Sequence, residues 1–137
     1  MMAEKGTRAI EYFSTNLKAP KVSFEEALLR GLAPDKGLYM PDRLPAIGEK
    51  LRARFSGMGY YEIAAHVLSA FLGDAIPFAD LTSMCRDAYT FDVPVEPAGD
   101  NLFILRLDQG PTASFKDFAA RLMARMMNYF MAKEKRH

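Results

Sequence analysis

The chain has 137 residues, which is enough for one modest domain. Half of the residues are hydrophobic, 26% are charged and the net charge is +1, a balance that argues against intrinsic disorder and against nucleic acid as a partner. The apolar stretches are too short and too interrupted to cross a bilayer, and the start has no signal-peptide pattern, so no membrane role is expected.

The first third of the chain predicts short elements joined by turns. Residues 9–14 are typical of a short strand. Ser23 followed by Glu26 is a capping-box pattern, and Gly31 can end the resulting helix in a left-handed conformation. Residues 34–37 form a turn signal, after which the chain is expected to be extended.

Three helices are predicted in the middle of the chain, one near 47–55, one over 60–72 and one that begins at Pro77. The single cysteine, Cys85, shares the apolar face of the third helix. One thiol cannot form an internal disulfide, so we expect a core role for Cys85 in a reduced, cytoplasmic protein. Two distant histidines and one cysteine give no metal-ligand spacing. His66 lies one helical turn after Glu62, which favours a surface pair.

The last third predicts a linker, a strand, a turn and a helix. Residues 93–97 are interpreted as a linker into a strand over 102–107, and Gly110-Pro111 is a turn signal. A helix is then predicted from Phe115, because apolar residues recur with a period of 3.6 and are expected to form a buried face. These residues are Phe115, Phe118, Ala119, Leu122, Met123, Met126, Met127, Phe130 and Met131. Asp117 and Arg121 fall on the opposite side, at a spacing that suits a weak surface pair.

Lys116 is the candidate reactive residue. It is predicted to lie in the first turn of this helix, on the flank of the apolar stripe beside Ala119 and Ala120. Partial desolvation among small residues would lower the pKa of its amine and leave more of it as a neutral nucleophile. The alternative is that Lys116 only extends to solvent from the edge of a buried helix.

Two segments carry a resemblance to a known family. The segment Gly110–Ala119 reads Gly-Pro-Thr-Ala-Ser-Phe-Lys-Asp-Phe-Ala and resembles the cofactor-lysine segment of threonine synthases, which depend on pyridoxal phosphate. Residues 12–15, 19–28 and 31–41 resemble the amino-terminal opening of the same family, in the same order and at about the same separation. The resemblance therefore spans nearly the whole chain.

The resemblance implies a fold, a reaction and site residues. The fold would be α/β: a mainly helical amino-terminal domain with short strands over residues 1–95, then over 96–137 the first strand–helix segment of a fold-type II pyridoxal-phosphate domain. The reaction would convert O-phosphohomoserine and water to threonine and phosphate. Lys116 would be catalytic and would hold pyridoxal phosphate as a Schiff base, and Phe115 and Asp117 would contact the cofactor and orient the lysine.

Other interpretations stay open at this level. The family often has an aromatic residue and a histidine where this chain has Asp108-Gln109, which leaves room for a related phospho-lyase or a cysteate synthase. The chain is also much shorter than the family's enzymes and stops before their glycine-rich phosphate loop. We therefore expect an amino-terminal fragment that is inactive alone and self-associates through the helix over 115–131. A non-catalytic helical interaction module is the alternative from another class.

Overall fold

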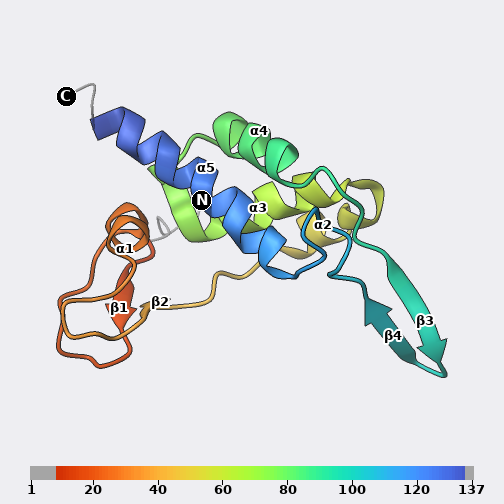
Figure 1. The fold of residues 1–137 in the computed structure, drawn as a ribbon, viewed down its shortest axis with the longest axis horizontal. Coiled ribbons are helices and arrows are strands. Elements are labelled where there is room, and N and C mark those ends of the chain that lie inside the picture. Colours follow the sequence, from red (N-terminus) through yellow and green to blue (C-terminus); the bar gives the residue numbers. More distant parts are fainter. Residues whose placement is uncertain (1–8, 135–137) are drawn as a thin grey trace, which may run out of the picture.

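The structure is a computed structural model that describes residues 9–134. Three helices form its centre: α3 (Tyr60–Leu72), α4 (Phe78–Ala88) and α5 (Lys116–Glu134). In Figure 1, α4 packs against both α3 and α5, whereas the strands lie at the two ends of the molecule. This mixture of helices and short strands is the α/β arrangement that the sequence predicts.

The main hydrophobic core lies between the three central helices. In α4 and α5 its buried members recur every three or four residues, as burial of one helical face requires. The buried residues of the whole core are Ala65, Leu72, Ile76, Leu81, Cys85, Ala88, Leu122, Met126 and Phe130. Burial raises the pKa of the Cys85 thiol to about 11, so this sulfur stays protonated and inert at neutral pH. The expected core role of Cys85 is confirmed.

A small amino-terminal unit packs beside this core. Strand β1 (Tyr12–Ser14) pairs antiparallel with β2 (Tyr39–Pro41), and α1 (Phe24–Arg30) lies between them in sequence. The Ser23 hydroxyl accepts a hydrogen bond from the Glu26 amide at 3.2 Å, and Gly31 ends α1 with φ of 74°. The predicted start and end of this helix are therefore confirmed.

The predicted turn between α1 and β2 is closed by one carboxylate. Asp35 accepts hydrogen bonds from the Ser14 hydroxyl at 2.6 Å and from the Gly37 amide at 3.0 Å. These bonds, led by the one from Ser14, lower the pKa of Asp35 below its ordinary value. The Asp35 side chain thus ties the turn to β1.

One predicted helix is much shorter than expected. Instead of a helix over 47–55, the structure has α2 (Glu49–Arg52) and a separate 3₁₀ turn, η1 (Phe55–Gly57). Neither has a buried residue. Short helices depend on tertiary packing for their stability, so the helix does not extend where no apolar face is covered.

The predicted linker over 93–97 is wrong. Strand β3 (Val95–Gly99) pairs antiparallel with β4 (Leu102–Leu105), and Asn101 takes a left-handed φ of 57° in the turn between them. Pro97 is tolerated because this two-stranded hairpin has open edges. The hairpin projects away from the helices (Figure 1), and every residue in both strands is exposed.

His66 also differs from its prediction. Its ring lies against that of Phe78, with centroids 4.8 Å apart, and the Glu62 carboxylate accepts instead from the Gly59 amide at 2.8 Å. The first-turn position of Glu62 favours this cap over a side-chain pair.

No helix in residues 9–134 is long and apolar enough to span a membrane.

Candidate functional site

The candidate site lies where the β3–β4 hairpin leads into α5. Strand β4 ends at Leu105, a turn follows over 110–115, and α5 begins at Lys116. The predicted succession of strand, turn and helix is therefore present. The candidate lysine is the first residue of the helix.

The turn before Lys116 is held by the side chain of Asp117. The Thr112 amide donates to Asp117 Oδ2 at 2.9 Å, and the Thr112 hydroxyl donates to Asp117 Oδ1 at 2.9 Å. Gly110 packs so closely on this carboxylate that an added Cβ would lie 2.7 Å from the Cβ of Asp117. Only glycine fits at that position. We call this arrangement of Gly110, Thr112 and Asp117 the Asp117 latch.

The latch corrects one prediction. Asp117 is 6% exposed and faces back over its own turn, rather than lying on the outer side of α5 in a pair with Arg121. The reason is that a carboxylate at the start of a helix finds free amide and hydroxyl donors in the preceding turn. This signal was available in the sequence as Thr112 five residues before Asp117.

Backbone strain is stored in the same turn. Ala113 has a left-handed φ of 53°, which costs a non-glycine residue about 1–2 kcal/mol. The Ala113 amide donates to the Gly110 carbonyl at 3.0 Å, and the Lys116 amide donates to the Ser114 hydroxyl at 3.3 Å. Residues 110–117 thus form a tight, internally bonded unit that positions the start of α5.

The Lys116 side chain is exposed, which corrects the expected partial desolvation. Ala119 and Ala120 are exposed as well, and residues of this size cover too little surface to shield an amine. The Nζ atom lies 5.0 Å from the centroid of the Phe115 ring, itself 64% exposed. No carboxylate of residues 9–134 forms an ion pair with this amine. Of the three predicted site residues, Phe115 lies beside the Lys116 amine, and Asp117 lies in the first turn of α5 with its carboxylate bonded back to Thr112.

Only part of the predicted apolar stripe of α5 is buried. Leu122, Met126 and Phe130 face the core, whereas Phe115, Met123 and Met131 are 64%, 44% and 48% exposed. One face of α5 packs on α4 and the amino-terminal unit, and the neighbouring face is left open because no sheet lies on it in the described part of the chain.

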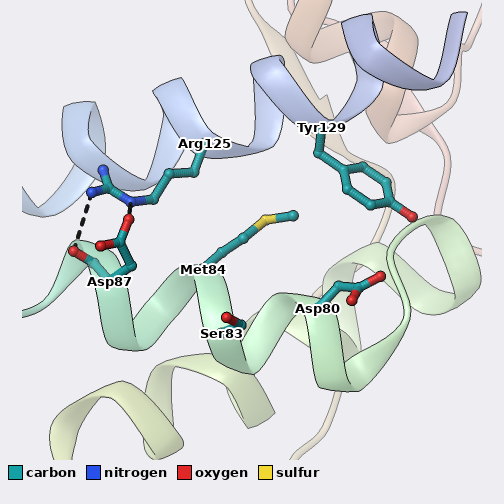
Figure 2. Close-up of a pocket in the computed structure, with 6 residues that line it drawn as sticks. All are labelled: Asp80, Ser83, Met84, Asp87, Arg125 and Tyr129. Atoms are coloured by element: carbon teal, nitrogen blue, oxygen red, sulfur yellow. Dashed lines mark hydrogen bonds and ion pairs between the residues drawn. The ribbon is translucent and has the colours of Figure 1, made fainter.

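Arg121 and Arg125 are not outer-face residues. Arg121 Nε donates to the Ala88 carbonyl at 2.6 Å, and its Nη2 donates to Thr90 Oγ1 at 3.2 Å. Arg125 forms an ion pair with Asp87 that lowers the pKa of that carboxyl (Figure 2). Both arginines therefore bind the carboxyl-terminal end of α4, where free carbonyl groups attract cations.

Figure 2 also shows a shallow groove between α4 and α5. Asp80, Ser83 and Met84 line it from α4, and Tyr129 lines it from α5, at the end away from the arginine pair. Asp87 and Arg125 line the other end of the groove, which lies along the middle and far end of α5, whereas Lys116 is the first residue of that helix. No group of three or more potential metal ligands gathers within residues 9–134.

Asp108 and Gln109, the two residues that depart from the family pattern, take part in a network of surface hydrogen bonds. Arg106 donates to Glu96 Oε1 at 3.0 Å and to Asp108 Oδ2 at 2.7 Å, and Gln109 donates to Asp108 Oδ1 at 3.2 Å. The Arg106 guanidinium holds the pKa of Asp108 well below its usual range. Asp108 thus fastens the base of the hairpin to the segment that enters the turn.

These features define an α/β protein whose candidate reactive group is a lysine on a latched strand–turn–helix corner. Comparison with known proteins supplies the family. A family model described as "Threonine synthase N terminus" matches residues 11–89. The chain belongs to the threonine synthase family.

Individual relatives agree with this assignment. The threonine synthase of Pseudomonas aeruginosa is 36% identical over 129 residues, which cover 90% of this chain and 28% of the relative. Threonine synthase-like 2 of Mus musculus is 36% identical over 132 residues, 92% of this chain and 27% of the relative. The chain thus spans little more than a quarter of the length of these relatives.

A solved structure is also similar. The crystal structure of pyridoxal-phosphate-bound threonine synthase from Brucella melitensis matches with a TM-score of 0.86 and 42% identity, over 93% of this chain and 28% of that one. An α/β fold of this kind is therefore known to occur as one segment of a larger cofactor-bound protein.

Proposed function

We propose that this chain supplies the amino-terminal segment and the cofactor lysine of a pyridoxal-phosphate-dependent threonine synthase. The reaction would convert O-phosphohomoserine and water to L-threonine and phosphate. The observation that carries the proposal is the exposed amine of Lys116 on its latched corner, in a chain that matches a cofactor-bound threonine synthase at a TM-score of 0.86.

The residues present fit part of the cofactor. An aldehyde reacts with a primary amine that is accessible and not held by a carboxylate, and Lys116 meets both conditions within residues 9–134. The nearby hydroxyls of Thr112 and Ser114 are already engaged, with Asp117 and with the Lys116 amide. Contacts to the cofactor phosphate and ring nitrogen would come from the length that the relatives have beyond this match.

Pyridoxal phosphate, when bound, acts as an electron sink for negative charge at the substrate α carbon. Lys116 would hold the cofactor covalently and, once the substrate amine has replaced it, would move protons at the α and β carbons as a neutral amine. Phosphate leaves from the γ carbon, and a water molecule supplies the hydroxyl group at the β carbon. Phe115 would cover one side of the amine, and Asp117 would contribute by holding the turn.

Two further interpretations rest on particular observations. Asp108-Gln109, which stands where the family often has an aromatic residue and a histidine, supports a related phospho-lyase or cysteate synthase as the alternative activity. The open apolar faces of α5 and the hairpin support a helical module that binds another protein or a second copy.

The buried, reduced Cys85 is consistent with a cytoplasmic location.

A chimaera tests the proposed function. Residues 1–137 would replace the matching segment of the Brucella melitensis enzyme, to which this chain is 42% identical. We expect the chimaera to bind pyridoxal phosphate and to release threonine and phosphate in equal amounts from O-phosphohomoserine. Release of phosphate without threonine would favour a phospho-lyase.

The decisive variant is Lys116→Ala in that chimaera, with Lys133→Ala as the matched control. Both lysines are exposed on α5, and Lys133 has only a surface contact with Glu25 at 3.9 Å. We expect Lys116→Ala to lose nearly all turnover and all borohydride-trapped cofactor, whereas Lys133→Ala keeps both. Trapped cofactor and full turnover in the Lys116 variant would overturn the assignment. The isolated chain should neither bind the cofactor tightly nor turn over the substrate.

A further inference from the structure

The first two turns of α5 are held by the carboxyl-terminal end of α4. The Tyr89 hydroxyl donates to the Phe118 carbonyl at 3.0 Å, across 29 residues of sequence. One turn further along α5, Arg121 donates to the Ala88 carbonyl and to Thr90. The carboxyl-terminal end of α4 is thus hydrogen-bonded to the first two turns of α5 at two points.

An aromatic cluster surrounds the first of these points. The Phe118 ring lies 5.7 Å from that of Tyr60 and 5.2 Å from that of Phe91, both edge-on, and the Tyr89 ring lies 5.0 Å from that of Tyr60. Burial is the main cause that raises the pKa of the Tyr89 hydroxyl, and electrostatic interactions with Tyr60 and Cys85 raise it further. The hydroxyl therefore stays a hydrogen-bond donor at any physiological pH.

Among the described residues, no hydrogen bond joins α5 to the hairpin. The hairpin residues are exposed throughout, and the Asp117 latch bonds the turn to α5 itself rather than to the helical core. Lys116 precedes Phe118 by two residues and Arg121 by five, which corresponds to about 3 Å and about 7.5 Å along the helix axis. The bonds from the end of α4 are therefore the described hydrogen bonds nearest to Lys116 that join α5 to the core.

We propose that Tyr89 and Arg121 are positioning residues for the Lys116 amine, which they hold in register with the α3–α4 core through Phe118 and the second turn of α5. This inference builds on the proposed function, because it assigns a purpose to the position of the amine. Among the described residues, the hydrogen bonds of these two side chains go to Phe118, Asp87, Ala88 and Thr90, and none goes to the amine or to the turn over 110–115.

Hydrogen–deuterium exchange on the 137-residue chain tests the bonds between α4 and α5 without any cofactor. Tyr89→Phe removes the hydroxyl and keeps the ring in its cluster. We expect amides of residues 117–122 to exchange about two- to tenfold faster, the change that corresponds to one lost hydrogen bond. Tyr61→Phe is the matched control, because no hydrogen bond of the Tyr61 hydroxyl occurs in residues 9–134. Unchanged exchange over 117–122 in Tyr89→Phe would overturn the inference.

Arg121→Lys provides a second variant, since lysine keeps the charge but cannot reach both Ala88 and Thr90 from one planar group. Arg52→Lys is its control, at an exposed side chain with a loose 3.8 Å pair. In the chimaera, both positioning variants should lower kcat by about 3- to 30-fold with little change in KM, and should weaken the circular dichroism of the bound cofactor at saturation. A lowered melting temperature with unchanged kcat and dichroism would mean a purely structural role.

The two proposals can fail separately. If Lys116→Ala in the chimaera keeps trapped cofactor, the proposed function fails whatever the exchange data show. If Lys116→Ala behaves as expected but Tyr89→Phe leaves the exchange over 117–122 unchanged, or both positioning variants leave kcat and dichroism unchanged, only the positioning role fails.

Discussion

Lys116 differs from the other lysines within residues 9–134 by the turn that precedes it rather than by its burial. Its amine is exposed, yet its backbone follows a strained alanine, Ala113, and a buried carboxylate, Asp117. A helix start of this kind fixes the direction of the first side chain at little cost to its accessibility. The sequence predicts that Lys116 is set apart by desolvation of its amine. In the structure it is set apart by the orientation of its side chain at the start of the helix.

The contribution of the Asp117 latch can be measured by Asp117→Ala. This change leaves the Thr112 amide and hydroxyl without their acceptor in a partly buried turn, so we expect a loss of about 1–3 kcal/mol in the free energy of unfolding. Urea denaturation of the 137-residue chain measures it. Asp92→Ala, at an exposed side chain with no hydrogen bond among the described residues, should change stability by less than about 0.5 kcal/mol. Equal effects of the two substitutions would contradict the latch.

At the scale of elements, α5 joins two parts of the molecule that the sequence assigns separately. The predicted division places residues 96–137 in a second domain. The buried residues of α5 nevertheless belong to the same hydrophobic core as those of α3 and α4. Near its far end, Phe130 is fully buried and its ring lies 6.2 Å from that of Phe24 in α1. The position of the whole helix therefore depends on contacts with the amino-terminal part of the chain.

Phe130→Ala tests this packing. Removing a fully buried aromatic ring costs about 3–5 kcal/mol, a large share of the 5–15 kcal/mol typical of a small domain. We expect the chemical denaturation midpoint to fall sharply and the far end of α5 to lose amide protection. Met131→Ala serves as the neighbouring control, because that side chain is 48% exposed. A small effect of Phe130→Ala would mean that α5 is not docked on α1.

At the scale of the whole molecule, the apolar surface is distributed unevenly. Leu102, Phe103, Ile104 and Leu105 in the hairpin are between 49% and 63% exposed, and Phe115 and Met123 of α5 are also open. A net charge of +1 offers little repulsion between copies. Open strand edges and apolar side chains together favour association.

We therefore expect the 137-residue chain to self-associate through the hairpin and the open face of α5. Sedimentation velocity should show a mean mass that rises with concentration, and Phe103→Lys should reduce this rise. Leu44→Lys adds the same charge at another side chain, 81% exposed and outside the hairpin, and should leave it unchanged. A monomer at every concentration would contradict the expectation.

Local signals in the sequence were sufficient for several features of this protein. The bounds of α3, the cap at Ser23, the left-handed Gly31 and the place of Lys116 at a strand–turn–helix corner all agree with the structure. Each depends on residues within about four positions of one another, where backbone geometry and helical period dominate. The family resemblance likewise rests on short segments, over residues 12–15, 19–28, 31–41 and 110–119.

Only the tertiary structure decided which faces are covered and which residues hold the site. Arg121 contacts Ala88 across 33 residues, and Tyr89 contacts Phe118 across 29. The partner of an arginine or a tyrosine at such separations is set by how whole helices pack, which no local period encodes. The same reason explains the β3 strand read as a linker and the exposed amine of Lys116, because pairing and burial are properties of the assembled fold.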